Sequence, residues 1–148
     1  MPGRRGFQLT PPDGKRVRIT APVVREPVLH RAIADALRVE IAPAGRASRQ
    51  GVVWWSVDMA AYAGKLPGLR TLRGCVAGVP DLVVIYQGRA YFIELKARDN
   101  GVSLAQTVVG HSILVCGGRF AVARDVEEVL GLLDAWEIPR EKRIRGAA

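Results

Sequence analysis

Two carboxylates and one amine are spaced so that a β-hairpin would bring them together. The apolar segments 79–86 and 89–97 flank Gln87-Gly88, a pair typical of a two-residue hairpin turn. Counting outward from that turn places Asp81 opposite Glu94. Because side chains alternate between the faces of a strand, Lys96 returns to the face of Glu94. The spacing therefore predicts one cluster of Asp81, Glu94 and Lys96.

Such a cluster favours metal-dependent chemistry on a phosphodiester. Two carboxylates about 5 Å apart repel by about 3 kcal/mol at an effective dielectric of 20, and a divalent cation would offset this repulsion. Mg²⁺ prefers hard oxygen ligands, and the backbone carbonyl of Leu95 could supply one more. Lys96 could then orient the attacking water or stabilise developing charge. The alternative is that Lys96 simply pairs with an acid at a sheet edge, and a three-residue turn would separate the cluster.

Two further residues could join this site. Glu26 lies three residues before Leu29 and seven before Ile33, which predicts a position on the buried stripe of a helix. The alternatives are a simple favourable interaction with the helix dipole, or a site role for Glu40 in its place. Gln106 follows a potential N-cap serine by three residues, and this spacing by itself predicts a capping box.

The elements that must position these residues alternate between helix and strand. The sequence predicts an α/β fold with a mixed central sheet, and the apolar character of both hairpin faces predicts helices on both sides. Besides the hairpin, we expect a helix from Glu26 to about Ile41, a strand within 51–60, a helix opened by Ser103 and ended at Gly117, a strand at 119–124, and a helix from a capping box at Asp125 and Glu128 to about Trp136.

The charge distribution points to a polyanionic partner. The chain carries 22 basic and 14 acidic side chains, a net charge of +8. Excess positive charge lies in an N-terminal arm, 1–23, and in a C-terminal tail, 139–148. It also lies in the central segment 42–74, in which Asp58 is the one acidic residue. Neutralised phosphates would release counterions and favour binding, although solvated tails explain the same pattern. If their segment lies beside the site, the predicted DNA contacts are Arg46, Arg49, Lys65, Arg70 and Arg73.

Length and composition exclude several classes of protein. A chain of 148 residues with 49% hydrophobic residues fits one globular domain. Neither an apolar run long enough for a membrane span nor a secretory leader is visible. Cys75 and Cys116 do not form a disulfide framework or a zinc motif. We therefore expect a soluble, cytoplasmic protein with no membrane partner.

These residues together resemble the PD-(D/E)xK nuclease superfamily and, within it, the virus-type replication-repair nuclease (VRR-NUC) domain. Four motifs in order carry the resemblance: Glu26 early in the first helix, Gly78-Val79-Pro80-Asp81-Leu82, Glu94-Leu95-Lys96, and Gln106 early in the next helix. The resemblance implies a restriction-endonuclease-like core over residues 24–138. It also implies a structure-directed DNA endonuclease that uses Mg²⁺ or Mn²⁺, acts on branched DNA such as four-way junctions, and forms a homodimer. In such a site, the resemblance implies that Gln106 contacts the phosphate or the attacking water.

Two other functions use the same fold. One is a DNA-binding or architectural protein without catalysis, and the other is a restriction-type or RNA-directed nuclease. Metal-dependent cutting of DNA would distinguish an enzyme from the non-catalytic DNA-binding protein. The helix after Ser103 is unusually apolar, which we interpret as a possible dimer face.

Overall fold

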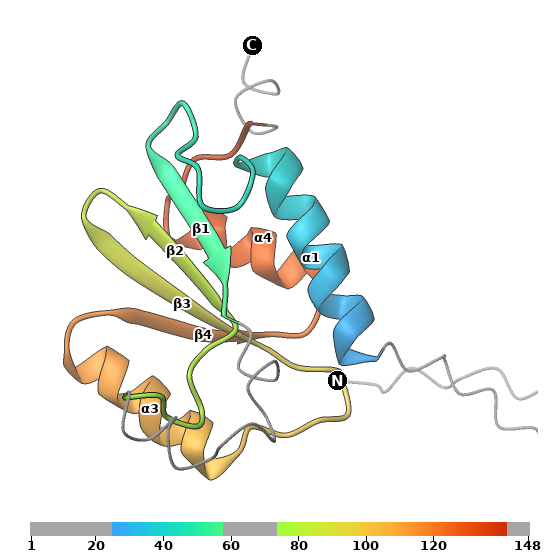
Figure 1. Ribbon diagram of the computed structural model, residues 1–148, viewed down its shortest axis with the longest axis vertical. Coiled ribbons are helices and arrows are strands. Elements are labelled where there is room, and N and C mark those ends of the chain that lie inside the picture. Colours follow the sequence, from blue (N-terminus) through green and yellow to red (C-terminus); the bar gives the residue numbers. More distant parts are fainter. Residues whose placement is uncertain (1–24, 58–73, 142–148) are drawn as a thin grey trace, which may run out of the picture.

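The structure, a computed structural model, describes residues 25–57 and 74–141. Three helices and four strands follow one another in the predicted order (Figure 1). They are α1 (Glu26–Glu40), β1 (Val52–Ser56), β2 (Leu82–Tyr86), β3 (Arg89–Leu95), α3 (Leu104–Val115), β4 (Arg119–Ala123) and α4 (Val126–Ala135). Among the described helices, none has the length and apolar character needed to cross a membrane.

The hairpin of β2 and β3 has the predicted two-residue turn. Gln87 and Gly88 both have positive φ angles, 48° and 71°, as the turn that matches strand twist requires. The strands pair with Tyr86 opposite Arg89 and Leu82 opposite Ile93. This register is the one predicted from the turn, and one further step along it leads to the Asp81 and Glu94 positions.

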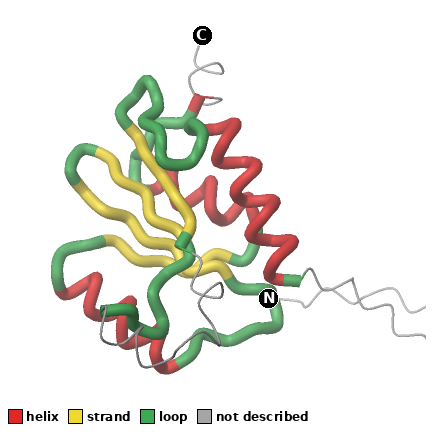
Figure 2. Tube along the Cα trace, viewed as in Figure 1, coloured by secondary structure: helices red, strands yellow, loops and turns green. Residues whose placement is uncertain are grey.

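The four strands form one mixed sheet in the order β1-β2-β3-β4 (Figure 2). The first three strands are antiparallel, and β4 runs parallel to β3 after the crossover through α3. The strands β2 and β3 are shorter than predicted. Strand β2 begins only at Leu82, after Pro80, which lacks an N–H for strand pairing.

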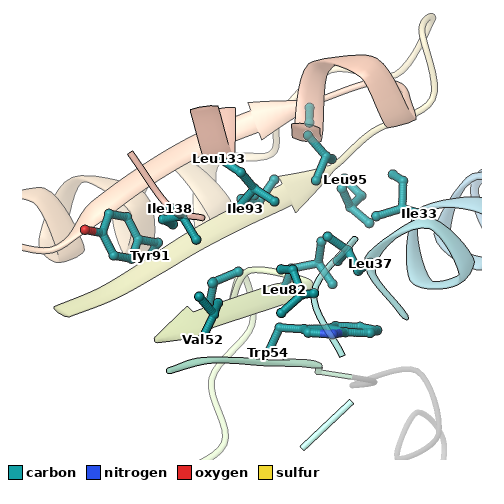
Figure 3. Packing of buried hydrophobic residues seen from close by; sticks show 14 of the residues in the cluster. Ile33, Leu37, Val52, Trp54, Leu82, Tyr91, Ile93, Leu95, Leu133 and Ile138 are labelled. Atoms are coloured by element: carbon teal, nitrogen blue, oxygen red, sulfur yellow. The ribbon is translucent and has the colours of Figure 1, made fainter. Parts of the chain in front are cut away.

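One face of the sheet carries the main core. Helix α1 buries Leu29, Ile33 and Leu37, a stripe with the predicted spacing of four. These residues pack with Ile93 and Leu95 of β3 in one cluster, which helix α4 also joins (Figure 3). Helices α1 and α4 therefore cover this face together, as Figure 1 shows.

The opposite face is covered along β4 by α3. Gly110 is the buried residue of this helix, and a Cβ there would lie 2.5 Å from the ring of Phe120. The predicted covering of both sheet faces is thus confirmed. Much of the apolar surface of α3 nevertheless remains exposed, including Leu104, Val108 and Val115.

The two predicted capping boxes have different outcomes. At α3, Ser103 and Gln106 form the complete reciprocal pair. At α4, Asp125 accepts the Glu128 N–H at 2.8 Å, but Glu128 accepts the N–H of Arg124 instead of that of Asp125. Because Arg124 lies beyond the paired residues of β4, its N–H needs a partner, and Glu128 supplies one.

Candidate functional site

The hairpin brings Asp81 and Glu94 to the same end of the sheet. Asp81 directly precedes β2, and its Oδ2 accepts the N–H of Leu95 at 2.8 Å. Glu94 lies near the end of β3 and is only 2% exposed. Burial, followed by the negative charge of Asp81, raises the pKa of Glu94 to about 7. The predicted proximity of the two carboxylates is therefore present in the structure.

Lys96 lies between two acidic side chains. Its Nζ is 3.6 Å from Oε1 of Glu94 and 3.9 Å from Oε1 of Glu26. The Lys96 side chain is 14% exposed, so the amine faces its acidic neighbours in a largely desolvated position. Lys96 therefore lies on the side of the sheet where Glu94 and Asp81 meet, as the alternation of side chains along the strand predicted.

Glu26 joins the site from the first turn of α1. Its Oε1 accepts a hydrogen bond from Nδ2 of Asn100 at 2.9 Å. This hydrogen bond is the main reason that the pKa of Glu26 is lowered, with a further contribution from the charge of Lys96. The side chain is 36% exposed, so it lies at the rim of the site and not in the core as the helical stripe predicted. The first turn of α1 extends past the packed core, which explains this difference.

The alternative acid, Glu40, is bound elsewhere. It ends α1, some 20 Å along the helix from Glu26 at 1.5 Å per residue. There its Oε2 accepts from Nη1 of Arg140 at 2.9 Å, and Arg140 also contacts Asp134. The first charged residue of the predicted tail is thus part of the packed domain, and Glu40 has a structural role.

Gln106 completes the predicted capping box and also contacts Glu94, while its predicted contact with phosphate or an attacking water stays a prediction. Its Oε1 accepts the N–H of Ser103 at 2.8 Å, which closes the capping box. Its Nε2 donates to Oε1 of Glu94. The same side chain therefore starts α3 and orients the buried carboxylate.

Gly78 allows α3 to approach the hairpin. Its φ is +87°, a region that favours glycine. A Cβ at this position would lie 2.4 Å from the backbone of Ala105 and 2.6 Å from the nitrogen of Gln106. Any side chain at position 78 would push away the turn that carries Gln106.

The second oxygen of Glu94 shows how a cation would fit. Oε2 is buried and has no hydrogen-bond partner among residues 25–57 and 74–141. An unpaired buried carboxylate oxygen is costly, and a cation between it and Asp81 would offset both the burial and the repulsion. The donor set consists of hard oxygens, which suits Mg²⁺ or Mn²⁺.

The candidate metal site has two closely placed carboxylates rather than a complete cage. In the part of the chain that the structure describes, no group of three or more His, Cys, Asp or Glu side chains is arranged to hold an ion. Asp81 and Glu94 would therefore bind it together with water and substrate oxygens, a common arrangement for Mg²⁺. Glu26 and the Leu95 carbonyl stay predicted as additional ligands.

Sequence reasoning missed two residues of the site. His30 places Nε2 3.9 Å from Oδ2 of Asp81, and Asn100 binds Glu26. His30 follows Glu26 by four residues, so the two share a helix face, and this spacing could have revealed it. Asn100 lies in an irregular turn 74 positions from its partner, and no periodic pattern marks it.

The two predicted DNA contacts that the structure describes, Arg46 and Arg49, do not belong to this cluster. Arg46 and Arg49 are exposed in the segment between α1 and β1, at the opposite end of α1 from Glu26 (Figure 1). The first pair of β1 is Val52 with Tyr86, which is the end of β2 remote from Asp81. The condition for the predicted contacts, a segment beside the site, is therefore not met for these two arginines. The remaining three, Lys65, Arg70 and Arg73, lie outside the described residues.

The arrangement combines paired carboxylates, a desolvated amine and an orienting amide at one end of a mixed sheet. These groups can bind a divalent cation and position a water molecule beside a phosphate. No model of a known protein family matches the chain, and neither does any curated protein or solved structure.

Proposed function

We propose that this protein is a metal-dependent DNA endonuclease with a PD-(D/E)xK core similar to VRR-NUC domains. Its substrate is branched DNA such as a four-way junction, in which it hydrolyses a phosphodiester bond with Mg²⁺ or Mn²⁺. The observation that carries the proposal is the convergence of Asp81 and Glu94 beside the amine of Lys96. Oε2 of Glu94 is buried there without a hydrogen-bond partner in the described part of the chain.

The protein's own residues have separate roles in this reaction. Asp81 and Glu94 would hold the cation, and Gln106 orients the Glu94 carboxylate through its hydrogen bond to Oε1. Lys96 donates hydrogen bonds to the attacking water and to the phosphate oxygens, on which negative charge develops. Glu26 lies beside this amine and keeps it directed into the site. The bound ion would lower the pKa of water and stabilise negative charge.

The exposed surface of α3 supports a homodimer. Leu104, Val108 and Val115 are 80%, 56% and 72% exposed, and their spacing of four and seven places them on one helix face. The helix contains no Lys, Arg, Asp or Glu, so its exposed face suits another apolar surface better than DNA. A second copy of the same face would satisfy this requirement by two-fold symmetry.

Cleavage of synthetic DNA tests the activity. A labelled four-way junction and a linear duplex of the same sequence are incubated with Mg²⁺, Mn²⁺ or EDTA. We expect metal-dependent cutting of the junction, lost in Asp81→Asn and Lys96→Met with junction binding retained. Asp35→Asn is the matched control, because Asp35 is exposed on α1 and pairs only with Arg38 among the described side chains.

Two results would contradict the enzymatic proposal. Junction binding without cutting in either metal would indicate the architectural function. Cutting that persists in Lys96→Met and Asp81→Asn would show that the activity comes from elsewhere. Equal cutting of linear duplex would remove the preference for branched DNA and favour a restriction-type nuclease, and a ribonucleotide version of the junction separates DNA from RNA cleavage.

A further inference from the structure

Glu26 needs support that its own helix does not provide. It is the first residue of α1, and the N-cap residue Arg25 makes no capping hydrogen bond with its side chain. The first turn of a helix lacks internal partners for its N–H groups and is prone to fraying. A carboxylate in this position stays beside Lys96 only if another segment holds it there.

Asn100 supplies a side-chain hydrogen bond that helps to hold it. Its Nδ2 donates to Oε1 of Glu26 at 2.9 Å, the same oxygen that faces Nζ of Lys96. Asn100 lies in the turn that follows β3, where its N–H donates to the carbonyl of Ala97 at 3.0 Å. The side-chain amide of Asn100 can orient Glu26 only if the 97–100 turn is itself held in place.

The carbonyl groups of the turn are bound by the guanidinium of Arg124, and the side chain of Arg98 within the turn pairs with Asp125 at 3.0 Å. Nη1 of Arg124 donates to the carbonyl oxygens of Ala97 at 2.7 Å and Asn100 at 2.8 Å, and lies 3.3 Å from that of Arg98. Hydrogen bonds from a charged donor are stronger than neutral ones. Arg124 therefore replaces the regular strand partners that the chain loses after Leu95.

Arg124 itself is anchored in the rigid part of the domain. Its N–H donates to Oε2 of Glu128 in α4 at 2.7 Å. The preceding residue, Ala123, is fully buried and accepts the N–H of Lys96 at 3.0 Å. The backbone that carries Arg124 is thus paired directly with the backbone of the predicted catalytic lysine.

We propose that Arg124 is a positioning residue for the site, which acts through the 97–100 turn and Asn100 to place the carboxylate of Glu26 beside Lys96. Arg124 touches neither substrate nor metal in this role. Its effect on cleavage rests on the proposed nuclease function, whereas its effect on Glu26 does not. Loss of a supporting hydrogen bond behind such a site typically reduces activity by about 10-fold to 100-fold.

The position of Glu26 can be measured without any activity. The side-chain carboxyl ¹³C signal of Glu26 is assigned in the full, metal-free chain by comparison with Glu26→Gln. We expect Asn100→Ala and Arg124→Met to displace this signal in the same direction, and Arg124→Lys, which keeps a charged donor, to restore it towards its original place. Arg38→Met is the matched control, because Arg38 is 53% exposed near the far end of α1 and pairs with Asp35 rather than with the 97–100 turn.

The second measurement is junction cleavage by the same variants. We expect kcat to fall by about 10-fold or more in Asn100→Ala and Arg124→Met with KM unchanged, and Arg38→Met to cleave normally. An unchanged Glu26 signal in Arg124→Met, or an equal displacement in Arg38→Met, overturns the proposal. A displaced signal with normal cleavage also overturns it.

Folding and function are kept separate by two further comparisons. Thermal unfolding identifies any variant that no longer folds. If Arg124→Met does not fold, an unchanged Glu26 signal in folded Asn100→Ala is by itself sufficient to overturn the proposal. If the wild-type protein cuts no DNA, the nuclease function fails, and the carboxyl signals still decide whether Arg124 positions Glu26.

Discussion

Gln106 donates its side-chain amide to the buried carboxylate of Glu94 while the same side chain caps α3. Gln106 therefore belongs both to the capping box at the start of α3 and to the contacts of the site. The start of α3 and the orientation of Glu94 are therefore coupled.

The two roles of Gln106 can be separated by mutation. Ser103→Ala removes the capping hydroxyl but leaves the amide on Glu94, so we expect a loss of about 1 kcal/mol in the free energy of unfolding and unchanged Mn²⁺ binding. Gln106→Ala should lower stability similarly and also weaken Mn²⁺ binding by about 10-fold or more. Urea unfolding and titration calorimetry measure the two quantities. Equal Mn²⁺ affinities in both variants would contradict the coupling.

Glu94 should make the metal-free protein less stable as the pH rises. Its pKa is raised to about 7 in the folded state from an ordinary value of 4.5, so between these values the folded state binds more protons than the unfolded state. Stability is highest below about pH 4.5 with respect to this group and declines as the pH rises through 7.

The decline is measured by unfolding at pH 5 to 8 in EDTA. We expect Glu94→Gln to remove it, because the amide does not titrate, and saturating Mg²⁺ to reduce it by favouring the ionised carboxylate. The control is Glu127→Gln in the first turn of α4, which should keep the wild-type decline. A Glu94→Gln protein with the wild-type pH dependence would show that another group is responsible.

Gly78 should be far less replaceable than Gly88. Both have positive φ angles, +87° and +71°, but a Cβ at position 88 meets no atom within 4 Å, whereas one at 78 would overlap the backbone of Ala105. We expect Gly88→Ala to cost about 1 kcal/mol from backbone strain alone. Gly78→Ala should cost clearly more and should also weaken Mn²⁺ binding, because it displaces Gln106. Equal losses in urea unfolding would contradict the close approach.

The dimer proposal is tested on the exposed face of α3. Light scattering should give a mass near twice 16.1 kDa for the wild-type chain, and Val108→Lys should reduce it to the monomer value. The matched variant is Thr107→Lys, because Thr107 is also exposed but lies about 100° further round the helix. A wild-type monomer at working concentration, or a dimer that persists in Val108→Lys, would contradict this interface.

The hairpin and its register could be predicted because short-range physics decides them. Gln87 and Gly88 accept the positive φ angles of a tight turn, and a two-residue turn leaves one register open to the strands. Asp81, Glu94 and Lys96 then share a face by strand alternation alone. The helices were recognisable for a similar reason, since capping residues and apolar spacing act within a few positions of the chain.

The tertiary structure alone decided which distant groups meet this cluster. Asn100 reaches Glu26 across 74 positions, and Arg124 reaches the turn after β3 across some 25. It also placed Arg46 away from the site. Such contacts depend on how α1 packs against the sheet that contains β4. Residues in an irregular turn follow no periodic pattern in the sequence, so these contacts could not be predicted from it. The sequence by itself determined the local pair of carboxylates and their lysine, and only the packed fold determined what surrounds and supports them.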